Sequence, residues 1–283
     1  MRKLSKLSCL LIAGIMGASL SAQAATWLTY NTDGNISDQT VNAGDNVIIN
    51  STQQYDTSYS PGLVLVGNSA TGTLNMSAND LTGFGWYKVG SGATAVGVVN
   101  QSGGTAGAVN LYLGEGGSSG TYNMSGGILN VGTVDAGTYL TLLANNLINF
   151  SGGTSTINGR VSCGSTSTIR VTGSDATVNL YQATGTMAGT YEFIFDAAGV
   201  SSLDYSSYVQ FAAGAKLVVD GSAYTRGPAS FTLIDTYATG MLMDFAAENI
   251  TVTGFPGGYT LEQNAGDVTL NDTTPRGTVI SIQ

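Results

Sequence analysis

Residues 113–127, Leu-Gly-Glu-Gly-Gly-Ser-Ser-Gly-Thr-Tyr-Asn-Met-Ser-Gly-Gly, contain one complete copy of a motif that is repeated along the chain. Its centre is an apolar residue, an Asn, one further residue and a Ser. This tetrapeptide occurs as Leu74-Asn75-Met76-Ser77, Val99-Asn100-Gln101-Ser102, Tyr122-Asn123-Met124-Ser125 and Ile148-Asn149-Phe150-Ser151. The Asn residues are 25, 23 and 26 positions apart, and three copies continue into Gly-Gly. A period of this length indicates a repeat architecture.

A second series of residues keeps the same period at a different phase. Gly67, Gly90 and Gly114 each follow a pair of mostly apolar residues, at steps of 23 and 24. A unit of this length is too long for a hairpin and shorter than a propeller blade. It fits one coil of a parallel β-helix, in which successive coils stack at about 4.8 Å. The sequence therefore predicts an all-β solenoid of coils with about 23–26 residues.

The alternation within each copy predicts which side chains face inward, because successive strand residues point to opposite faces. The apolar column would fill the interior, together with Met76, Gln101, Met124 and Phe150. The Asn column would form a ladder of amides on the outer face, each donating to one coil and accepting from another. Gln101 interrupts the apolar column. We expect either that it reaches a carbonyl at a corner or that its coil is locally shifted.

Two other interpretations of the repeat stay open. An antiparallel β-sandwich with irregular internal similarity is the alternative fold. The four Asn-x-Ser triplets also match the acceptor pattern for N-glycosylation. Their regular spacing favours a structural ladder.

The N-terminal segment has the organisation of a secretory signal peptide. Arg2, Lys3 and Lys6 precede an apolar stretch at 7–20, and Ala22-Gln23-Ala24 provides small residues for cleavage. The apolar stretch is shorter than the roughly 20 residues that span a bilayer. We expect cleavage after Ala24, no transmembrane segment in the mature chain, and a secreted or cell-surface location, with the periplasm as an alternative.

Composition excludes several classes of function. The chain has 283 residues, a net charge of −9 and no basic cluster after the N-terminal segment, which makes nucleic acid an unsuitable partner. It has no His and two Cys, of which only Cys163 lies after the predicted signal peptide, so a zinc or copper site is not expected. We interpret Cys163 as a structural residue, because a nucleophilic thiol needs a neighbouring base.

The regions on either side of the repeats are predicted to differ from the repeats in structure. Residues 25–60 read as a cap, with Trp27 and Tyr30 available to cover the open end of the helix. The predicted organisation is a signal peptide at 1–24, a cap and β-helix repeats at 25–184, and a C-terminal β-rich module at 185–283. That last module is predicted to contain either irregular coils ending in a cap or a small β-sandwich.

The stretches 113–127 and 99–105 resemble the repeats of secreted bacterial proteins of the autotransporter-associated β-strand type, including those that carry a PEP-CTERM sorting tail. The resemblance covers about residues 60–180. It implies a right-handed β-helical stalk or passenger at the cell surface, and it implies no chemistry. The C-terminal stretch at 274–283 departs from these relatives, because it has no Pro-Glu-Pro motif, apolar helix or basic tail.

Catalytic groups were sought because some parallel β-helices degrade polysaccharides. Glycoside hydrolysis needs two carboxylates within about 5–10 Å, which on a β-helix means acids at matching positions on neighbouring coils. Between Asp80 and Asp175 the only acids are Glu115 and Asp135, at different phases of the repeat. Acids of the C-terminal region offer a chance Ca²⁺ site or a solvated acidic surface: Asp196, Asp204, Asp220, Asp235, Asp244 and Glu248.

These observations assign no catalytic, cofactor-binding or metal-binding residue, and no cofactor. The expected function is that of a non-catalytic, exported structural or adhesive protein of the bacterial cell surface or extracellular matrix. Fourteen Tyr residues make a carbohydrate-binding module the alternative, and a polysaccharide lyase or hydrolase ranks third. The expected partners are surface polysaccharides or other cell-envelope components, and the oligomeric state is left open.

Overall fold

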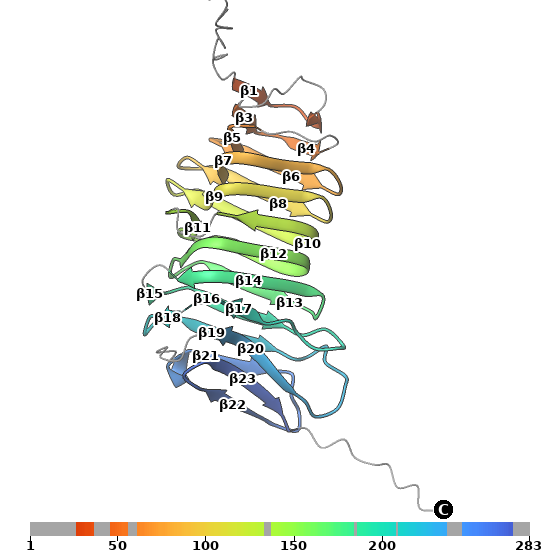
Figure 1. Cartoon of the computed structure of the whole chain (residues 1–283), viewed down its shortest axis with the longest axis vertical. Helices are drawn as coiled ribbons and strands as arrows, with labels where there is room; N and C mark the ends of the chain where they lie inside the picture. Colours follow the sequence, from red (N-terminus) through yellow and green to blue (C-terminus); the bar gives the residue numbers. More distant parts are fainter. Residues whose placement is uncertain are drawn as a thin grey trace, which may run out of the picture.

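The computed structural model describes residues 27–36, 46–55, 61–132, 137–183, 186–207, 209–236 and 245–273. This part of the chain is built from β-strands and one short 3₁₀ turn, Ala247–Asn249. The strands stack along one long axis, from β1 at one end to β22 and β23 at the other (Figure 1). The all-β solenoid of stacked coils predicted from the repeat is confirmed.

Each regular coil has three sides, which we call faces A, B and C in chain order. Face A carries the Asn motif and consists of β2 (Gly34–Asn35), β4 (Thr52–Tyr55), β6 (Thr71–Met76), β8 (Val96–Gln101), the start of β10 (Ser119–Val131), the start of β12 (Leu147–Cys163), β13 (Thr168–Thr172), β16 (Thr190–Ile194), β19 (Lys216–Asp220) and β21 (Ile250–Thr253).

Faces B and C share several long strands that bend around a corner. Face B consists of the starts of β7 (Asp80–Ser91) and β9 (Thr105–Glu115), the end of β10, the middle of β12, β14 (Ala176–Ala183), β17 (Leu203–Tyr205) and β20 (Ser230–Thr236). Face C consists of β1 (Trp27–Tyr30), β3 (Asn46–Ile49), β5 (Leu63–Asn68), the ends of β7 and β9, β11 (Tyr139–Leu142) and the end of β12. β15 (Thr186–Met187) and β18 (Gln210–Phe211) form a separate parallel pair.

The predicted Asn ladder lies in one file across face A. Asn75 pairs in register with Asn100, Asn100 with Asn123, and Asn123 with Asn149. The amide of Asn100 donates to Oδ1 of Asn75, and that of Asn123 to Oδ1 of Asn100, both at 2.9 Å. In the next two coils, the residues that continue this file are Arg170 and Glu192. They form an ion pair, in which Arg170 Nε lies 2.6 Å from Glu192 Oε2.

The two Gly series mark the corners of the coils. Gly90 follows face C, has a φ of 76°, and a Cβ built there would lie 2.3 Å from the carbonyl oxygen of Ser119. Gly127 lies between faces A and B with a φ of 80°, and a Cβ there would lie 2.4 Å from the carbonyl oxygen of Gly104. At both corners the backbone of a neighbouring coil occupies the space of a side chain, and the left-handed φ favours glycine.

The interior is filled as the alternation predicted. Leu74, Val99, Tyr122 and Ile148 are all fully buried. Gln101 also points inward and is buried; its amide donates to the carbonyls of Ile128 (2.9 Å) and Gly104 (3.2 Å), and its Oε1 accepts from the hydroxyl of Tyr122 at 2.6 Å. Of the two explanations for this residue, the bonded corner carbonyl is the one observed, and Gln101 keeps the register with Met76 and Met124.

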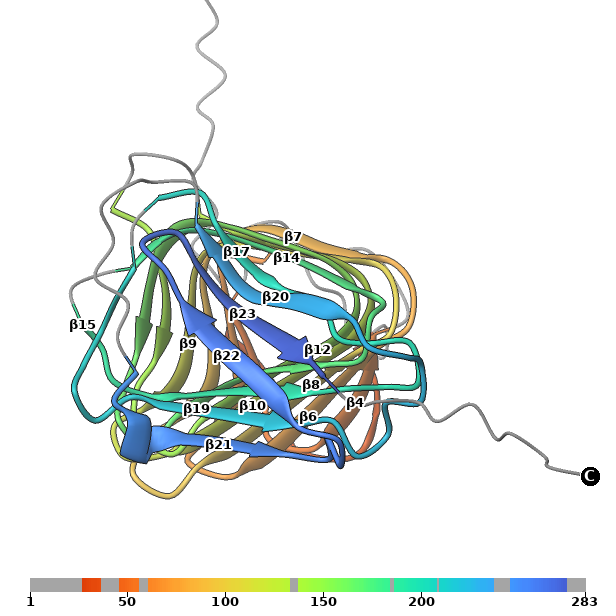
Figure 2. The same ribbon diagram turned by 90° about the horizontal axis from the view of Figure 1, so that it is seen from below.

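The stack continues past residue 184. β13 pairs with β16 and β14 with β17, both in parallel, and parallel pairing extends to β21. The chain then forms the hairpin of β22 (Tyr259–Gln263) and β23 (Asp267–Asp272), which pairs antiparallel with β20 and crosses the end of the coils (Figure 2). Irregular coils ending in a cap therefore describe this region, rather than a separate sandwich.

At the other end, the two aromatic residues of the predicted cap have different environments. Tyr30 is buried and its hydroxyl donates to the carbonyl of Ile36 at 2.8 Å. Trp27 lies on the outward side of β1 and is 56% exposed. The predicted signal peptide at 1–24 and the C-terminal stretch at 274–283 lie outside the described residues. Within the described part, no helix combines the length and hydropathy required to cross a membrane.

Candidate functional site

The outward side of face B carries a file of polar residues that becomes acidic toward the C-terminal end. Asn130 pairs with Thr156, Thr156 with Asn179, and Asn179 with Asp204. Asp204 pairs in register with Asp235, which pairs antiparallel with Asp267 of the terminal hairpin. Two carboxylates thus occupy matching positions on adjacent parallel strands, at a strand spacing of about 4.8 Å.

A hollow of about 460 Å³ lies beside these carboxylates. It is lined by Asn179, Asp204, Tyr205, Ser206 and Asp235. The hydroxyl of Ser202 donates to Oδ1 of Asp204, which fixes the direction of that carboxylate. Among the described residues, no group of three or more His, Cys, Asp or Glu side chains is arranged to hold a metal ion.

Two of the other C-terminal acids hold turns. Burial opposes ionisation of Asp196, but the N–H groups of Ser174, Gly199 and Ala198 and the Ser174 hydroxyl donate to its carboxylate and keep its pKa below the usual value. The hydroxyl and N–H of Ser222 lower the pKa of Asp220 in the same way. These two carboxylates are thus occupied in bonds to the backbone.

The C-terminal acids were expected to form either a chance Ca²⁺ site or a solvated acidic surface, and the five described ones lie in different places. Asp204 and Asp235 come together on face B, Asp196 and Asp220 serve separate turns, and Glu248 lies exposed in the 3₁₀ turn. Asp244 lies outside the described residues. The described part of the regular repeats at residues 80–175 offers no carboxylates at matching positions, whereas this pair lies in the irregular coils. Its signal in the sequence is an Asp or Asn that follows an apolar residue and precedes another residue with an inward side chain, in Val178-Asn179-Leu180, Leu203-Asp204-Tyr205 and Ile234-Asp235-Thr236.

Face C carries the second group of outward side chains, an aromatic patch that we define as Trp86, Lys88, Tyr112 and Glu115. The rings of Trp86 and Tyr112, from adjacent coils, have centroids 5.2 Å apart with their planes tilted by 37°. The Lys88 ammonium lies 5.4 Å from the centre of the Trp86 ring. Trp86 is 44% exposed, although tryptophan side chains are mostly buried in folded proteins.

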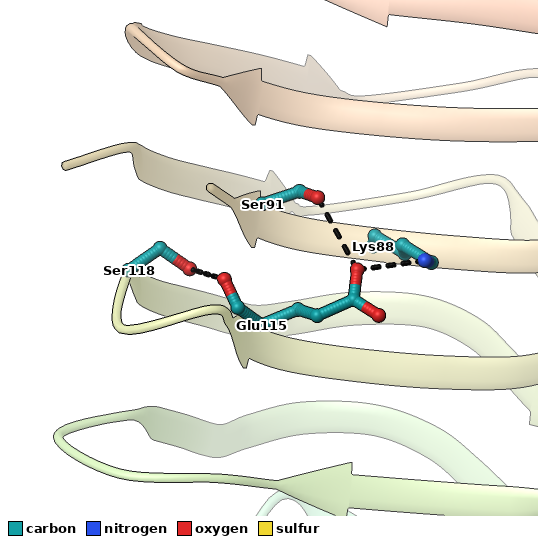
Figure 3. Close-up of polar contacts among 4 residues, drawn as sticks. All are labelled: Lys88, Ser91, Glu115 and Ser118. Atoms are coloured by element: carbon teal, nitrogen blue, oxygen red, sulfur yellow. Dashed lines mark hydrogen bonds and ion pairs between the residues drawn. The ribbon is translucent and has the colours of Figure 1, made fainter. Parts of the chain in front are cut away.

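The charges of the aromatic patch are paired across two coils (Figure 3). Nζ of Lys88 lies 2.7 Å from Oε2 of Glu115, and the Ser91 hydroxyl donates to the same oxygen at 3.3 Å. The hydroxyl of Ser118 donates to the backbone carbonyl of Glu115 at 2.7 Å, which closes the following turn. Both charged side chains are partly exposed, so the pair adds little to stability and leaves polar groups at the surface.

The aromatic patch was not assigned from the sequence, although a signal for it is present. Tyr87 and Val89 precede the corner residue Gly90 and are buried, which places Trp86 and Lys88 on the outer side of the same strand. The alternation of inward and outward residues, counted back from Gly90, is therefore sufficient to predict that Trp86 points outward. The contact with Tyr112 follows only from the register between β7 and β9.

Cys163, which we interpreted from the sequence as a structural residue, lies in the interior of the solenoid. It is buried among the interior side chains, and burial raises the pKa of its thiol to about 12. Its thiol donates to the carbonyl of Ser167 at 3.8 Å. A thiol in this environment stays protonated and is a poor nucleophile.

The chain was compared with protein-family models, with curated proteins and with solved structures, and none of the three comparisons gives a match.

Proposed function

We propose that this chain is a non-catalytic, exported structural and adhesive protein of a bacterial cell surface or extracellular matrix. The observation that supports it best is the unbroken file of paired strands on face A, which runs from β2 to β21. Ten strands at about 4.8 Å give a rod roughly 45 Å long. A rod of this kind presents side chains at fixed intervals along its faces.

Three further features support an exposed location for the rod. Charged residues make up only 10% of the chain, and Asn residues form part of the outer side of face A. The antiparallel hairpin β22–β23 closes one end, which protects strand edges from pairing with other chains. The N-terminal segment has the pattern of an export signal.

The carboxylate pair of face B favours polysaccharide hydrolysis as a second candidate function. Asp204 and Asp235 occupy matching positions on adjacent strands and line one hollow, which is the arrangement that a pair of catalytic acids requires on a β-helix. Incubating the full chain with polysaccharides and assaying new reducing ends tests this candidate directly. Activity that is lost in Asp204→Asn and Asp235→Asn would replace the structural proposal.

Localisation and attachment test the main proposal. In the source organism, a tagged full-length chain is expected at the cell surface or in the extracellular matrix, and deletion of the gene is expected to reduce attachment of cells to surfaces. Complementation with Asp204→Asn is expected to restore attachment, since no catalysis is required. A chain that stays in the cytoplasm, or a deletion strain with unchanged attachment, would contradict the proposal.

A further inference from the structure

The aromatic patch presents an apolar surface with a polar rim. Trp86 is 44% exposed on the outer side of β7, and Tyr112 is half-buried against it on the next coil. The Lys88 ammonium lies 5.4 Å from the centre of the Trp86 ring and forms one hydrogen-bonded group with the Glu115 carboxylate and the Ser91 hydroxyl. The arrangement therefore offers aromatic faces, donors and an acceptor within two adjacent coils.

We propose that the aromatic patch is a binding site for a neutral polysaccharide, whose chain crosses the two coils that carry Trp86 and Tyr112. The inference rests on the adhesive function proposed above and names the ligand class and the surface that carries it. Sugar rings combine a face of C–H groups with a rim of hydroxyls. Such a ring matches an exposed indole flanked by charged hydrogen-bonding groups.

The placement of the chain follows from the register of the two coils. Trp86 pairs in register with Asn110, and Lys88 pairs with Tyr112, so Tyr112 lies one coil beyond Trp86 and two residues further along the strand. The centroids of the two rings are 5.2 Å apart. A glycan that stacks on both rings would therefore cross the two coils obliquely.

The neutral charge of the ligand follows from the electrostatics. The one cation of the aromatic patch, Lys88, is already paired with Glu115 at 2.7 Å. The chain as a whole carries a net charge of −9, which repels an acidic polysaccharide. Stacking and hydrogen bonds would then supply the affinity, and binding should depend little on ionic strength.

A protein partner fits this surface less well. The centres of protein–protein interfaces are depleted of charged residues. Here an ion pair lies beside the exposed indole, on a face whose neighbouring outward residues include Asn46, Thr141 and Ser162. Capture of a protein through Trp86 is therefore an outcome that would contradict the inference.

The experiment measures binding of the full chain to insoluble cellulose, chitin and xylan, with polygalacturonate and alginate as acidic probes. The wild-type chain is expected to bind at least one neutral polysaccharide, with an affinity that changes less than twofold between low and high salt. Trp86→Ala is expected to weaken binding about tenfold or more, and Tyr112→Ala by a smaller factor. Trp86→Phe is expected to retain part of the affinity. Ligand-induced changes in tryptophan fluorescence should disappear in Trp86→Ala although Trp27 is still present.

Tyr259→Ala is the matched control, because Tyr259 is also an exposed aromatic residue (41%) but belongs to the terminal hairpin. It should bind as the wild type does. Equal unfolding midpoints for both variants would show that the fold is intact. Three outcomes would overturn the inference: no binding to any neutral polysaccharide, salt-sensitive binding to the acidic probes only, or unchanged binding by Trp86→Ala. If deletion of the gene still reduces attachment in any of these cases, the adhesive function stands and only the site falls.

Discussion

The coils at residues 63–183 and the coils at residues 186–273 solve the same stacking problem with different residues. The first region keeps its register with two repeated features. One is the Asn ladder of face A, and the other is the series of glycine corners such as Gly90 and Gly127. The second region has lost this period and packs large rings instead. Phe195 is surrounded by Tyr224, Phe231 and Phe255 at centroid distances of 4.8–5.8 Å, all close to edge-on.

The difference shows two ways to hold a β-solenoid in register. A ladder of identical residues requires coils of nearly equal length, because each member must meet its own copy on the next coil. Aromatic packing in the interior accepts unequal coils, as in the step of 31 residues between Asp204 and Asp235. A region held in this way lacks the sequence repeat from which the fold can be predicted. The irregular region also carries the antiparallel hairpin that ends the stack.

Removing a central ring should have the largest effect of any single change. Phe195→Ala is expected to cost about 3–5 kcal/mol of unfolding free energy, because it opens a cavity and removes three edge-on ring contacts. Phe150→Ala, in the regular region, removes a ring that is equally buried. It should cost less by about 1 kcal/mol, because ring pairs add to burial. Urea denaturation with hydrogen exchange would measure both; a larger loss for Phe150→Ala would contradict the aromatic account.

Glycine corners test the other way of holding register. Gly90→Ala is expected to cost about 2–4 kcal/mol, because φ is 76° and the new Cβ would lie 2.3 Å from the carbonyl oxygen of Ser119. Gly214→Ala, in a turn of the irregular region, meets nothing within 4 Å. It should change stability by no more than about 0.5 kcal/mol. Equal thermal midpoints for the two variants would show that the corners do not require glycine.

The same comparison explains how far the sequence predicts the fold. The solenoid, the Asn file and the inward direction of Gln101 followed from the period, because a repeated coil converts sequence distance directly into contact. The arrangement after residue 184 stayed open between two alternatives. Nothing local distinguishes a parallel strand such as β19 from one of a sandwich, and their pairings join segments 26 to 33 residues apart.

The candidate sites were harder to predict for a related reason. The pairing of Asp204 with Asp235 depends on a coil of irregular length, so no constant spacing relates the two acids. Trp86 is exposed because its neighbours Tyr87 and Val89 fill the interior, which alternation indicates. Its contact with Tyr112 and the ion pair of Lys88 with Glu115 need the register between coils to within one residue.

The buried polar group of the regular region should show an intermediate effect. Tyr122→Phe removes the hydroxyl that donates to Oε1 of Gln101 and leaves that buried oxygen without its partner, at a cost of about 1–3 kcal/mol. Adding Gln101→Leu removes the orphaned amide oxygen, together with the amide group that donates to the carbonyls of Ile128 and Gly104. The double variant should therefore be more stable than the sum of the two single changes. Strict additivity in chemical denaturation would show that the two side chains are not coupled.

The turn carboxylate of the irregular region should produce a pH-dependent effect of about 0.5–1 kcal/mol, small because the group is partly exposed. The pKa of Asp196 is lowered on folding, so its contribution is present above the usual aspartate pKa of about 3.9 and is lost as pH falls through the folded value. Asp196→Asn should therefore destabilise at pH 7, and its difference from the wild type should shrink below about pH 4. Glu248→Gln removes the same charge from an exposed turn and should leave stability at pH 7 unchanged. A loss shared by both variants would assign the effect to net charge.

The smallest effect is expected from a single step of the Asn ladder. Asn100 donates to Asn75 and accepts from Asn123, but all three amides lie at the surface, where water replaces a lost hydrogen bond. Asn100→Ala should therefore cost only about 0.5 kcal/mol. Thr251→Ala, at the same file position in the last parallel strand, should cost less still, because it ends the file instead of joining two neighbours.

Replacing all four ladder residues, Asn75, Asn100, Asn123 and Asn149, should cost more than the sum of the single changes, because chains of hydrogen bonds polarise one another. Simple additivity in the quadruple variant would mean that the ladder follows from the register of the coils and that the glycine corners and the interior set it.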